Sequence, residues 1–405
     1  MKILILSHFL PYPPHGGALQ RNHYLFREAA ATNEVHLLSF TQRNILNTEA
    51  KLSEAVAECD KTYKSVTVFK IPTDYSRFRW YLLLLFNLLS LTPYSVWRFR
   101  TGQMARKLRV MIAEGNFDLV HIDTIALAGY IKYLGRVPAV LNHHNIESSL
   151  MLRRGYSEKN PLVKLYILLQ GWKLRRYERL LAPRFALNLT VSELDALELL
   201  RFCPGAKTEV VPNGTNVEYF RPRPDEQATS MVWVGGMNWY PNRDAMTWFC
   251  EELFPRIRAR VPQATAVIVG QDPAKRVLEL AAHDPTIKVM GYVDDIREHV
   301  ARAAVFVVPI RVGGGTRLKI LDAFASGKAV VSTTIGAEGI GATNGTEILI
   351  GDSVEQFVDQ AVRALTDISL RRKLESNARQ FVERNYAWGI IGETLKQCYQ
   401  NAAKV

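Results

Sequence analysis

The sequence of 405 residues has few cysteines and no long hydrophobic run. Its cysteines form no C-x-x-C pair and have no histidine at metal-binding spacing, so we expect neither a disulfide framework nor a structural zinc site; they are Cys59, Cys203, Cys250 and Cys398. A reducing, cytoplasmic compartment fits this pattern best. The longest near-continuous apolar run, Tyr81 to Leu91, falls short of the roughly 18 to 20 residues that a membrane-spanning helix needs. We therefore expect no transmembrane helix.

Several ligand-binding signatures are also missing. The sequence has no G-x-G-x-x-G motif, and Gly327-Lys328 is followed by Ala329, so no phosphate-binding P-loop signature is present either. Neither D-x-D nor H-E-x-x-H occurs, which leaves a divalent metal without an obvious holder. We expect no cofactor and no metal. Helix dipoles and Arg or Lys side chains would have to neutralise any nucleoside diphosphate that binds.

The remaining composition is that of a folded protein. Hydrophobic residues make up 48% of the chain and charged residues 22%, so disorder is not expected. At about 150 residues per domain, the length predicts two or three compact units.

The net charge of +12 is concentrated in two segments. Residues 75–110 contain seven Lys/Arg and no Asp/Glu, and residues 151–186 contain nine Lys/Arg and two Glu. Both segments are rich in large apolar residues, including Trp80, Phe86 and Trp97. Basic residues beside Trp, Phe and Leu are typical of helices that lie in an anionic lipid interface. The alternative is a core helix with a solvated basic face. We expect an anionic membrane surface as a partner and no nucleic acid, because no nucleic-acid-binding module accompanies the charge.

Short β-branched runs alternate with helix-length segments along the chain. The first series of expected strands comprises residues 3–6, 35–40, 66–71, 119–122, 139–142, 187–191 and 209–211. The second series comprises residues 231–234, 265–269, 287–289, 304–308, 329–332 and 347–349. This alternation indicates right-handed βαβ crossovers and therefore an α/β fold with parallel sheets.

Each series opens with a strand, a loop containing Gly-Gly and an amphipathic segment. Two such openings predict two tandem Rossmann-like domains that face each other across a cleft. We place the N-terminal domain at residues 1–211, a Pro-rich linker at 212–230 and the C-terminal domain at 231–385. Open α/β sheets bind ligands beyond the carboxyl ends of their strands, so the cleft is the expected active site.

The most informative motif is VVPIRVGGGTRLKILDA, which joins an expected strand to a helix that should begin near Thr316. Its glycines allow backbone N–H groups to approach a ligand, and a helix N-terminus attracts phosphate. Two cations on the first turn suit a diphosphate, and a carboxylate further along could accept hydrogen bonds from sugar hydroxyls. The alternative is a Gly-rich turn with exposed basic residues. The residues assigned to this site are Gly313, Gly314, Gly315, Thr316, Arg317, Lys319 and Asp322.

Two shorter motifs occupy the same kind of position. Gly16 and Gly17 follow the first strand, and Gly236 follows the first strand of the second series, so their amides are expected to face a bound donor. Gly-Gly alone is often only a turn. His144 follows the strand at 139–142, where an imidazole could bind a sugar hydroxyl or stabilise developing charge. A structural role is the alternative for His144, and more so for His143.

Taken together, these motifs resemble a family-4-type retaining glycosyltransferase (group 1) of the GT-B architecture, over nearly the whole chain. The resemblance rests on PPHGG, VSE, VPNGTNVEYFRP, VGGMNWYPNRDA, GYVDDI and above all VVPIRVGGGTRLKILDAFASGKAVVSTTIGAEGI. It implies retaining transfer of a sugar from a nucleoside diphosphate held by the C-terminal domain to an acceptor held by the N-terminal domain. It also implies that no metal takes part and that a final helix, residues 386–405, returns to the N-terminal domain.

The family's paired acidic motif falls on Gly314 and Asp322. Asp322 stands where a glutamate usually holds the ribose, and Gly314 replaces the glutamate that meets the donor sugar. The family's usual Arg and Lys after the first strand of the C-terminal domain are absent, so phosphate binding is assigned to Arg317 and Lys319. His144 matches the histidine that lies near the donor sugar.

The sequence thus predicts a metal-independent hexosyltransferase of polysaccharide or glycolipid assembly, cytoplasmic and peripheral to the inner face of the membrane. Its substrates would be a nucleotide sugar and a glycan or lipid-linked acceptor. Front-face departure of the diphosphate, stabilised by Arg317, Lys319 and helix N–H groups, is the expected mechanism. Gly314 supports an alternative, a catalytically weak sugar-nucleotide-binding or scaffold subunit. A dehydrogenase is a third possibility.

Overall fold

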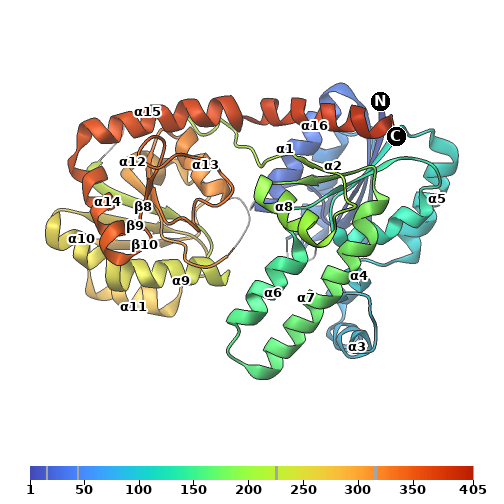
Figure 1. The fold of residues 1–405 in the computed structure, drawn as a ribbon, viewed down its shortest axis with the longest axis horizontal. Coiled ribbons are helices and arrows are strands. Elements are labelled where there is room, and N and C mark those ends of the chain that lie inside the picture. Colours follow the sequence, from blue (N-terminus) through green and yellow to red (C-terminus); the bar gives the residue numbers. More distant parts are fainter. Residues whose placement is uncertain (15–16, 43–44, 224–226, 314–316, 405) are drawn as a thin grey trace. The chain divides into compact units, whose positions relative to one another are not determined.

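Aliphatic and β-branched runs form two separate parallel sheets in the computed structural model, which describes residues 1–14, 17–42, 45–223, 227–313 and 317–404. The chain divides into two units (Figure 1): unit 1 is Met1–Pro212 with Ile391–Val405, and unit 2 is Asn213–Ile390. All but the first residue of the predicted linker at 212–230 falls in unit 2. None of the described helices is long and apolar enough to cross a membrane.

Unit 1 contains a seven-stranded parallel sheet in the order β3-β2-β1-β4-β5-β6-β7. Every strand expected in this part of the sequence is present. The strands are β1 (Lys2–Ser7), β2 (Glu34–Thr41), β3 (Ser65–Lys70), β4 (Leu119–Ile122), β5 (Ala139–Asn142), β6 (Leu187–Thr190) and β7 (Thr208–Val210). All residues of β4, β5 and β6 are buried, because helices cover both faces of a parallel sheet. This two-sided burial explains why the strands are continuous apolar runs in the sequence.

The helices of unit 1 follow the strands in the expected alternation. They are α1 (Gly17–Thr32), α2 (Glu49–Asp60), α3 (Arg77–Leu88), α4 (Tyr94–Arg98), α5 (Gly102–Gly115), α6 (Glu147–Ser157), α7 (Pro161–Leu181), α8 (Glu193–Phe202) and most of α16 (Trp388–Ala403), with 3₁₀ turns at Pro72–Tyr75, Ile125–Tyr133 and Ala182–Arg184. N-cap side chains stabilise the first turns of several helices. At the start of α5, for example, the side-chain oxygen of Thr101 accepts a hydrogen bond from the N–H of Met104. Helix α16 packs in unit 1, where the hydroxyl of Tyr399 lies 2.8 Å from Nδ1 of His121 on β4.

Unit 2 contains a six-stranded parallel sheet in the order β10-β9-β8-β11-β12-β13. The strands are β8 (Gln227–Val234), β9 (Thr265–Val269), β10 (Ile287–Gly291), β11 (Ala303–Val308), β12 (Ala329–Ser332) and β13 (Leu349–Ile350). The helices are α9 (Tyr240–Trp248), a π-helical turn (Phe249–Leu253), α10 (Phe254–Arg260), α11 (Lys275–His283), α12 (Arg297–Arg302), α13 (Leu318–Ala325), α14 (Val354–Thr366) and α15 (Ile368–Asn385). The predicted α/β class with two Rossmann-like domains is therefore confirmed.

Both sheets reverse their strand order beside the first strand. In unit 1, β1 pairs with β2 on one side and β4 on the other; in unit 2, β8 pairs with β9 and β11. The connections leave such a pair of strands in opposite directions, which opens a crevice at their carboxyl ends where α/β proteins bind ligands. The topology therefore points to the loops after β1 and β4 in unit 1 and after β8 and β11 in unit 2.

The two basic segments lie in α3 to α5 and in α6 and α7. Helices α6 and α7 form a long pair that projects from the sheet of unit 1 (Figure 1). Helix α3 is tied to this pair, because Nζ of Lys173 on α7 donates to the carbonyl of Asn87 on α3 at 2.6 Å. The segments that the sequence separates by some 40 residues thus belong to one region of unit 1.

Candidate functional site

The loop after β8 supplies Gly235 and Gly236, which bring backbone close to a cation on α13. A Cβ atom on Gly235 would lie 2.5 Å from Nζ of Lys319, and one on Gly270 would lie 1.9 Å from the carbonyl oxygen of Gly235. Only glycine fits such contacts without moving its neighbours. The carbonyl of Gly236 accepts a hydrogen bond from Nδ2 of Asn242 at 2.7 Å, which fixes the loop to α9.

Lys319 lies on the first turn of α13 and is half-buried. Its Nζ donates to Oδ1 of Asn242 at 3.1 Å and lies 3.5 Å from the centroid of the buried Trp233 ring. Burial, together with neighbouring Arg317, lowers the pKa of Lys319 well below its usual range. Among the residues that the structure describes, no carboxylate forms an ion pair with Lys319. An anion placed here would therefore restore the charged form.

Arg317 is the N-cap residue of α13 and only 5% exposed. The sequence predicted a helix start near Thr316 with exposed basic residues as the alternative to a site. The helix begins at Leu318, close to the predicted start, and neither cation is exposed. Gly313 has φ +134°, and a Cβ atom there would lie 2.6 Å from Nη2 of Arg317. Glycine at this position therefore leaves room for the guanidinium.

The structure describes only some of the other residues of the predicted donor site. Oδ1 of Asp322 accepts a hydrogen bond from the hydroxyl of Thr215 at 2.6 Å, so one carboxylate oxygen is already engaged within unit 2. Gly314, Gly315 and Thr316 lie outside the described residues, as does Gly16 of the N-terminal Gly-Gly. Gly17 is the exposed first residue of α1.

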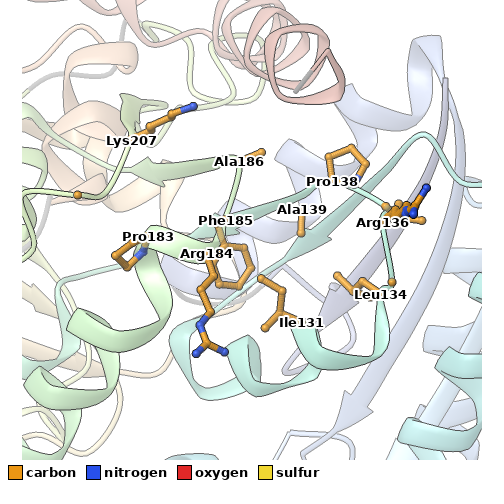
Figure 2. Close-up of a pocket in the computed structure, with 13 residues that line it drawn as sticks. Ile131, Leu134, Arg136, Pro138, Ala139, Pro183, Arg184, Phe185, Ala186 and Lys207 are labelled. Atoms are coloured by element: carbon orange, nitrogen blue, oxygen red, sulfur yellow. The ribbon is translucent and has the colours of Figure 1, made fainter.

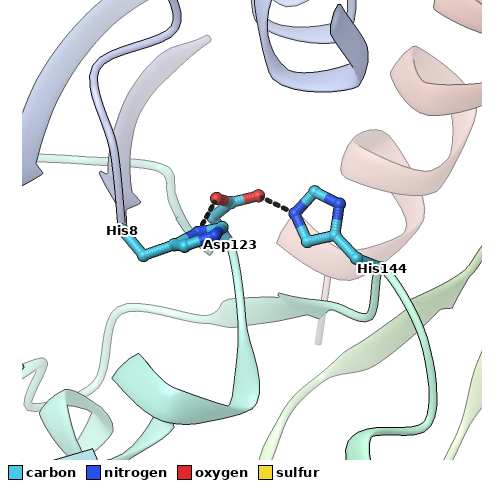
Figure 3. Close-up of side chains that lie close together, drawn as sticks. All are labelled: His8, Asp123 and His144. Carbon is cyan, nitrogen blue, oxygen red and sulfur yellow. Dashed lines mark hydrogen bonds and ion pairs between the residues drawn. The ribbon is translucent and has the colours of Figure 1, made fainter. Parts of the chain in front are cut away.

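The crevice of unit 1 holds a cluster that the sequence analysis missed. Asp123 follows β4, His8 follows β1 and His144 follows β5. Nδ1 of His8 lies 2.7 Å from Oδ2 of Asp123, and Nε2 of His144 lies 2.9 Å from its Oδ1 (Figure 3). The two imidazole rings are 5.5 Å apart, centroid to centroid. One signal could have found this cluster, because His8 and Asp123 lie within two residues of the ends of predicted strands, as His144 does.

Asp123 is fully buried and accepts further hydrogen bonds from its surroundings. Nδ2 of Asn22 donates to Oδ2 at 2.6 Å. The hydroxyl of Ser7 lies 3.2 Å from the same oxygen and 2.7 Å from the carbonyl oxygen of Phe9. Nδ2 of Asn142 donates to Oδ1 at 3.2 Å. Burial by itself would raise the pKa of Asp123, but His144 and His8 outweigh it and hold the pKa well below the usual range.

The two neighbouring histidines differ in their surroundings. Burial lowers the pKa of His144 although Asp123 opposes the shift, and the ring remains half-buried. His143 is fully buried, Nε2 lies 3.1 Å from Oδ1 of Asn188, and burial lowers its pKa to about 4. This burial agrees with the structural role, the alternative that the sequence analysis weighted more heavily for His143 than for His144.

His8, Asp123 and His144 could together supply ligands to a metal ion, since their ligand atoms lie within 4.8 Å of one another. Zinc ligands about 2.0 to 2.1 Å from the metal would be about 3.4 Å apart in a tetrahedral site. The observed nitrogen–oxygen distances of 2.7 and 2.9 Å are those of hydrogen bonds. In this geometry the three side chains form a hydrogen-bonded cluster. That no metal takes part stays a prediction.

A hollow of about 350 Å³ lies at the opposite edge of the unit 1 sheet, at the amino ends of β5 and β6. Figure 2 shows that its basic side chains, Arg136, Arg184 and Lys207, lie on different sides of the hollow and do not converge. The histidines and Asp123 are at the carboxyl edge, so this hollow is separate from the candidate site.

Two Rossmann-like domains in tandem fit the GT-B fold of glycosyltransferases. Residues 15–219 match the profile of Glycosyltransferase Family 4, and residues 228–367 match that of Glycosyl transferases group 1. The chain belongs to glycosyltransferase family 4, and the resemblance seen in the sequence is confirmed.

The chain is similar to several known proteins. A phosphatidyl-myo-inositol mannosyltransferase of Mycolicibacterium smegmatis is 25% identical over 330 residues, 77% of this chain and 79% of the relative. A GDP-mannose-dependent phosphatidylinositol monomannoside mannosyltransferase of Mycobacterium tuberculosis is 27% identical over 219 residues, 48% of this chain and 56% of the relative. An uncharacterised 44.6 kDa protein of the Klebsiella pneumoniae cps region is 23% identical over 164 residues, 39% of this chain and 42% of the relative. The matches thus span less than two thirds of the length of the last two relatives.

Two solved structures share the fold at low sequence identity. Sucrose-phosphate synthase from Thermosynechococcus elongatus has a TM-score of 0.71 at 16% identity, covering 99% of this chain and 98% of the other. Anabaena HepE in complex with UDP has a TM-score of 0.67 at 16% identity, covering 99% of this chain and all of the other.

Proposed function

We propose that this glycosyltransferase transfers a hexose with retention from a nucleoside diphosphate donor to a polysaccharide, glycolipid or lipid-linked acceptor, without a metal ion. One observation carries the proposal: at the switch point of unit 2 the cation Arg317 is buried and the cation Lys319 is half-buried. Lys319 has no carboxylate partner among the described residues, and its lowered pKa reflects the cost of burying a charge. A diphosphate would supply the missing negative charge.

The chemistry of the leaving group suits this pair of cations. When the glycosidic bond to phosphate breaks, negative charge grows on the diphosphate. Arg317 and Lys319, fixed by α13 and by Asn242, would stabilise that charge without rearranging. In this proposal unit 1 holds the acceptor, and His144 takes part in sugar binding. The UDP bound to HepE and the GDP-mannose dependence named for the mycobacterial relative support a nucleotide sugar as donor.

We further propose that unit 1 binds the inner, anionic face of a membrane. Large apolar side chains in the two basic segments are exposed, among them Leu89 at 90%, Leu162 at 79% and Phe78 at 71%. This exposure favours a lipid interface over core helices, which would bury the same residues. Arg77 and Arg79 are exposed beside them, whereas Arg98 donates to Asp74 at 2.8 Å. The phosphatidylinositol-linked substrates named for the mycobacterial relatives support a lipid acceptor.

A panel of nucleoside diphosphates and their sugars, tested by thermal shift in EDTA, would examine the donor assignment. A ligand that binds only the folded protein raises its melting temperature by mass action. We expect stabilisation by at least one diphosphate, followed by donor hydrolysis or transfer with its sugar. Binding without hydrolysis or transfer to any acceptor would favour the alternative function, a sugar-nucleotide-binding or scaffold subunit. No binding at all would contradict the proposal.

A further inference from the structure

Asp123 joins two imidazoles that come from different strands. His8 follows β1 and His144 follows β5, while Asp123 follows β4, which lies between them in the sheet (Figure 3). The cluster therefore lies at the carboxyl edge, with β1 and β4 forming the switch point. Asp123 is fully buried, whereas the side chains of His8 and His144 remain 17% and 10% exposed.

The surroundings of Asp123 determine the direction of its hydrogen bonds. The guanidinium of Arg21 can only donate, and its Nη2 donates to Oδ1 of Asn142 at 3.0 Å. The amide of Asn142 must therefore present its Nδ2 to Asp123, as observed. Nδ2 of Asn22 adds a donor on the other oxygen. Both side-chain amides that contact the carboxylate therefore donate to it, which is the arrangement that an ionised carboxylate requires.

An ionised carboxylate cannot donate, so each ring nitrogen that faces Asp123 must carry the hydrogen. These nitrogens are Nδ1 of His8 and Nε2 of His144. In a neutral imidazole the second nitrogen is then an acceptor. Among the residues that the structure describes, none donates a hydrogen bond to Nε2 of His8 or to Nδ1 of His144.

We propose that Asp123 is a positioning residue that holds His8 and His144 in the tautomers whose second ring nitrogen accepts a hydrogen bond from a sugar hydroxyl. The inference deepens the proposed function and rests on it. It adds His8 to the site and assigns both imidazoles to hydroxyl recognition. Two acceptors whose rings are 5.5 Å apart suit a ligand with several hydroxyls, such as a sugar. The charge on the diphosphate is then left to Arg317 and Lys319.

The tautomers can be measured directly on the 405-residue protein. Long-range ¹H–¹⁵N correlation spectra of ¹⁵N-histidine-labelled protein distinguish a protonated ring nitrogen from an unprotonated one. We expect Nδ1–H for His8 and Nε2–H for His144, assigned with the single variants below. The opposite tautomer at either ring, or a doubly protonated ring at pH 7.5, would overturn the inference. This measurement does not depend on activity.

Two variants keep the inward hydrogen bond and remove the outward acceptor. The amide nitrogen of Asn can occupy the position of Nδ1 in His8→Asn, and that of Gln the position of Nε2 in His144→Gln. We expect each to lower kcat about 10- to 100-fold, the effect of losing one strong hydrogen bond, with unchanged melting temperature and nucleotide Kd. Wild-type kcat and KM in both variants would refute the proposed roles.

Asp123→Asn tests the positioning role itself. Its amide NH₂ must face one of the two imidazoles, which is then forced into the other tautomer. We expect a loss of kcat of about 10- to 100-fold and a changed ¹⁵N pattern at one histidine. Asp118→Asn is the matched control, because Asp118 flanks the other end of β4, where it accepts from the N–H of Lys2 at 2.6 Å. If Asp123→Asn does not fold, the wild-type spectra still decide the inference. Absence of transferase activity in the wild type would instead contradict the proposed function.

Discussion

The ammonium group of Lys319 lies 3.5 Å from the centre of the buried indole ring of Trp233. The contact exists because Gly235 has no side chain: a Cβ atom there would lie 2.5 Å from the same nitrogen. The ring face attracts the cation but supplies no counter-charge. Trp233 of β8, Gly235 of the following loop and Lys319 of α13 therefore place a cation, with no carboxylate partner among the described residues, where we propose that a diphosphate binds.

Replacing Lys319 with Ala should weaken nucleoside diphosphate binding by roughly 1 to 3 kcal/mol, or about 5- to 150-fold, because one hydrogen bond to a charged group is lost. Titration calorimetry with UDP and GDP measures the change. Lys275→Ala is the control, since the Lys275 side chain is 93% exposed on α11 of the same unit. Equal affinities of wild type and Lys319→Ala would rule out the proposed role.

Diphosphate binding should be accompanied by proton uptake. The pKa of Lys319 is lowered by burial and by Arg317, so part of the population is neutral at alkaline pH, and a bound anion raises the pKa again. At pH 8.5 the apparent binding enthalpy should therefore depend on the ionisation enthalpy of the buffer. Lys319→Arg should abolish this dependence, since an arginine stays protonated. A wild-type enthalpy that is the same in all buffers would contradict the assignment.

Removal of divalent metal should leave diphosphate binding unchanged. The proposed site neutralises the ligand with Arg317, Lys319 and backbone N–H groups. We expect the Kd of the diphosphate to be the same in about 5 mM EDTA, which removes trace metal, as in excess Mg²⁺ or Mn²⁺. Loss of binding in EDTA, with recovery on adding a metal, would show that a metal completes the site.

Glu178→Gln should stabilise the protein at alkaline pH more than at acidic pH. Glu178 is fully buried on α7, where Oε1 accepts from the N–H of Ser148 at 3.2 Å, and burial raises its pKa to about 7. The unfolded chain loses this proton near pH 4.5, so wild-type stability falls as pH rises from about 4.5 to 7. The full difference is on the order of 3 kcal/mol. Urea unfolding at pH 5 and pH 8 compares the two proteins; an equal effect of the substitution at both values would disprove the expected burial of an ionisable group.

Membrane binding should depend on Arg77 and Arg79. Each basic residue near an anionic surface contributes about 1 kcal/mol, so Arg77→Ser with Arg79→Ser should weaken liposome binding by roughly 2 kcal/mol. Co-sedimentation with anionic liposomes measures this, and binding should fall as ionic strength rises. Lys275→Ser with Lys288→Ser removes the same charge from exposed positions of unit 2 and should have little effect. Wild-type protein that stays in the supernatant at low salt would contradict the membrane proposal.

The sequence alone was sufficient to predict every strand that the structure describes and the presence of two Rossmann-like domains. Parallel strands are buried on both faces, so each is a continuous apolar run that stands out from the amphipathic helices between them. His144 was also predictable, because a polar residue directly after such a strand lies at the carboxyl edge of the sheet. The cations of the Gly-rich loop were identified for a similar reason, as they follow β11 and begin α13.

Tertiary structure alone decided which of these residues meet. His8 and Asp123 are 115 positions apart, and they come together only because β4 pairs with β1, which no local pattern encodes. Burial likewise depends on packing. Exposed positions for Arg317 and Lys319 were one alternative from the sequence, whereas the fold buries Arg317 and half-buries Lys319. Leu89 and Phe78 show the opposite case, because both are residue types that usually form a core, yet both are exposed. The periodicity of a sequence indicates which face of its helix or strand a residue occupies. Only the packing of helices and strands against one another decides whether that face contacts protein or solvent.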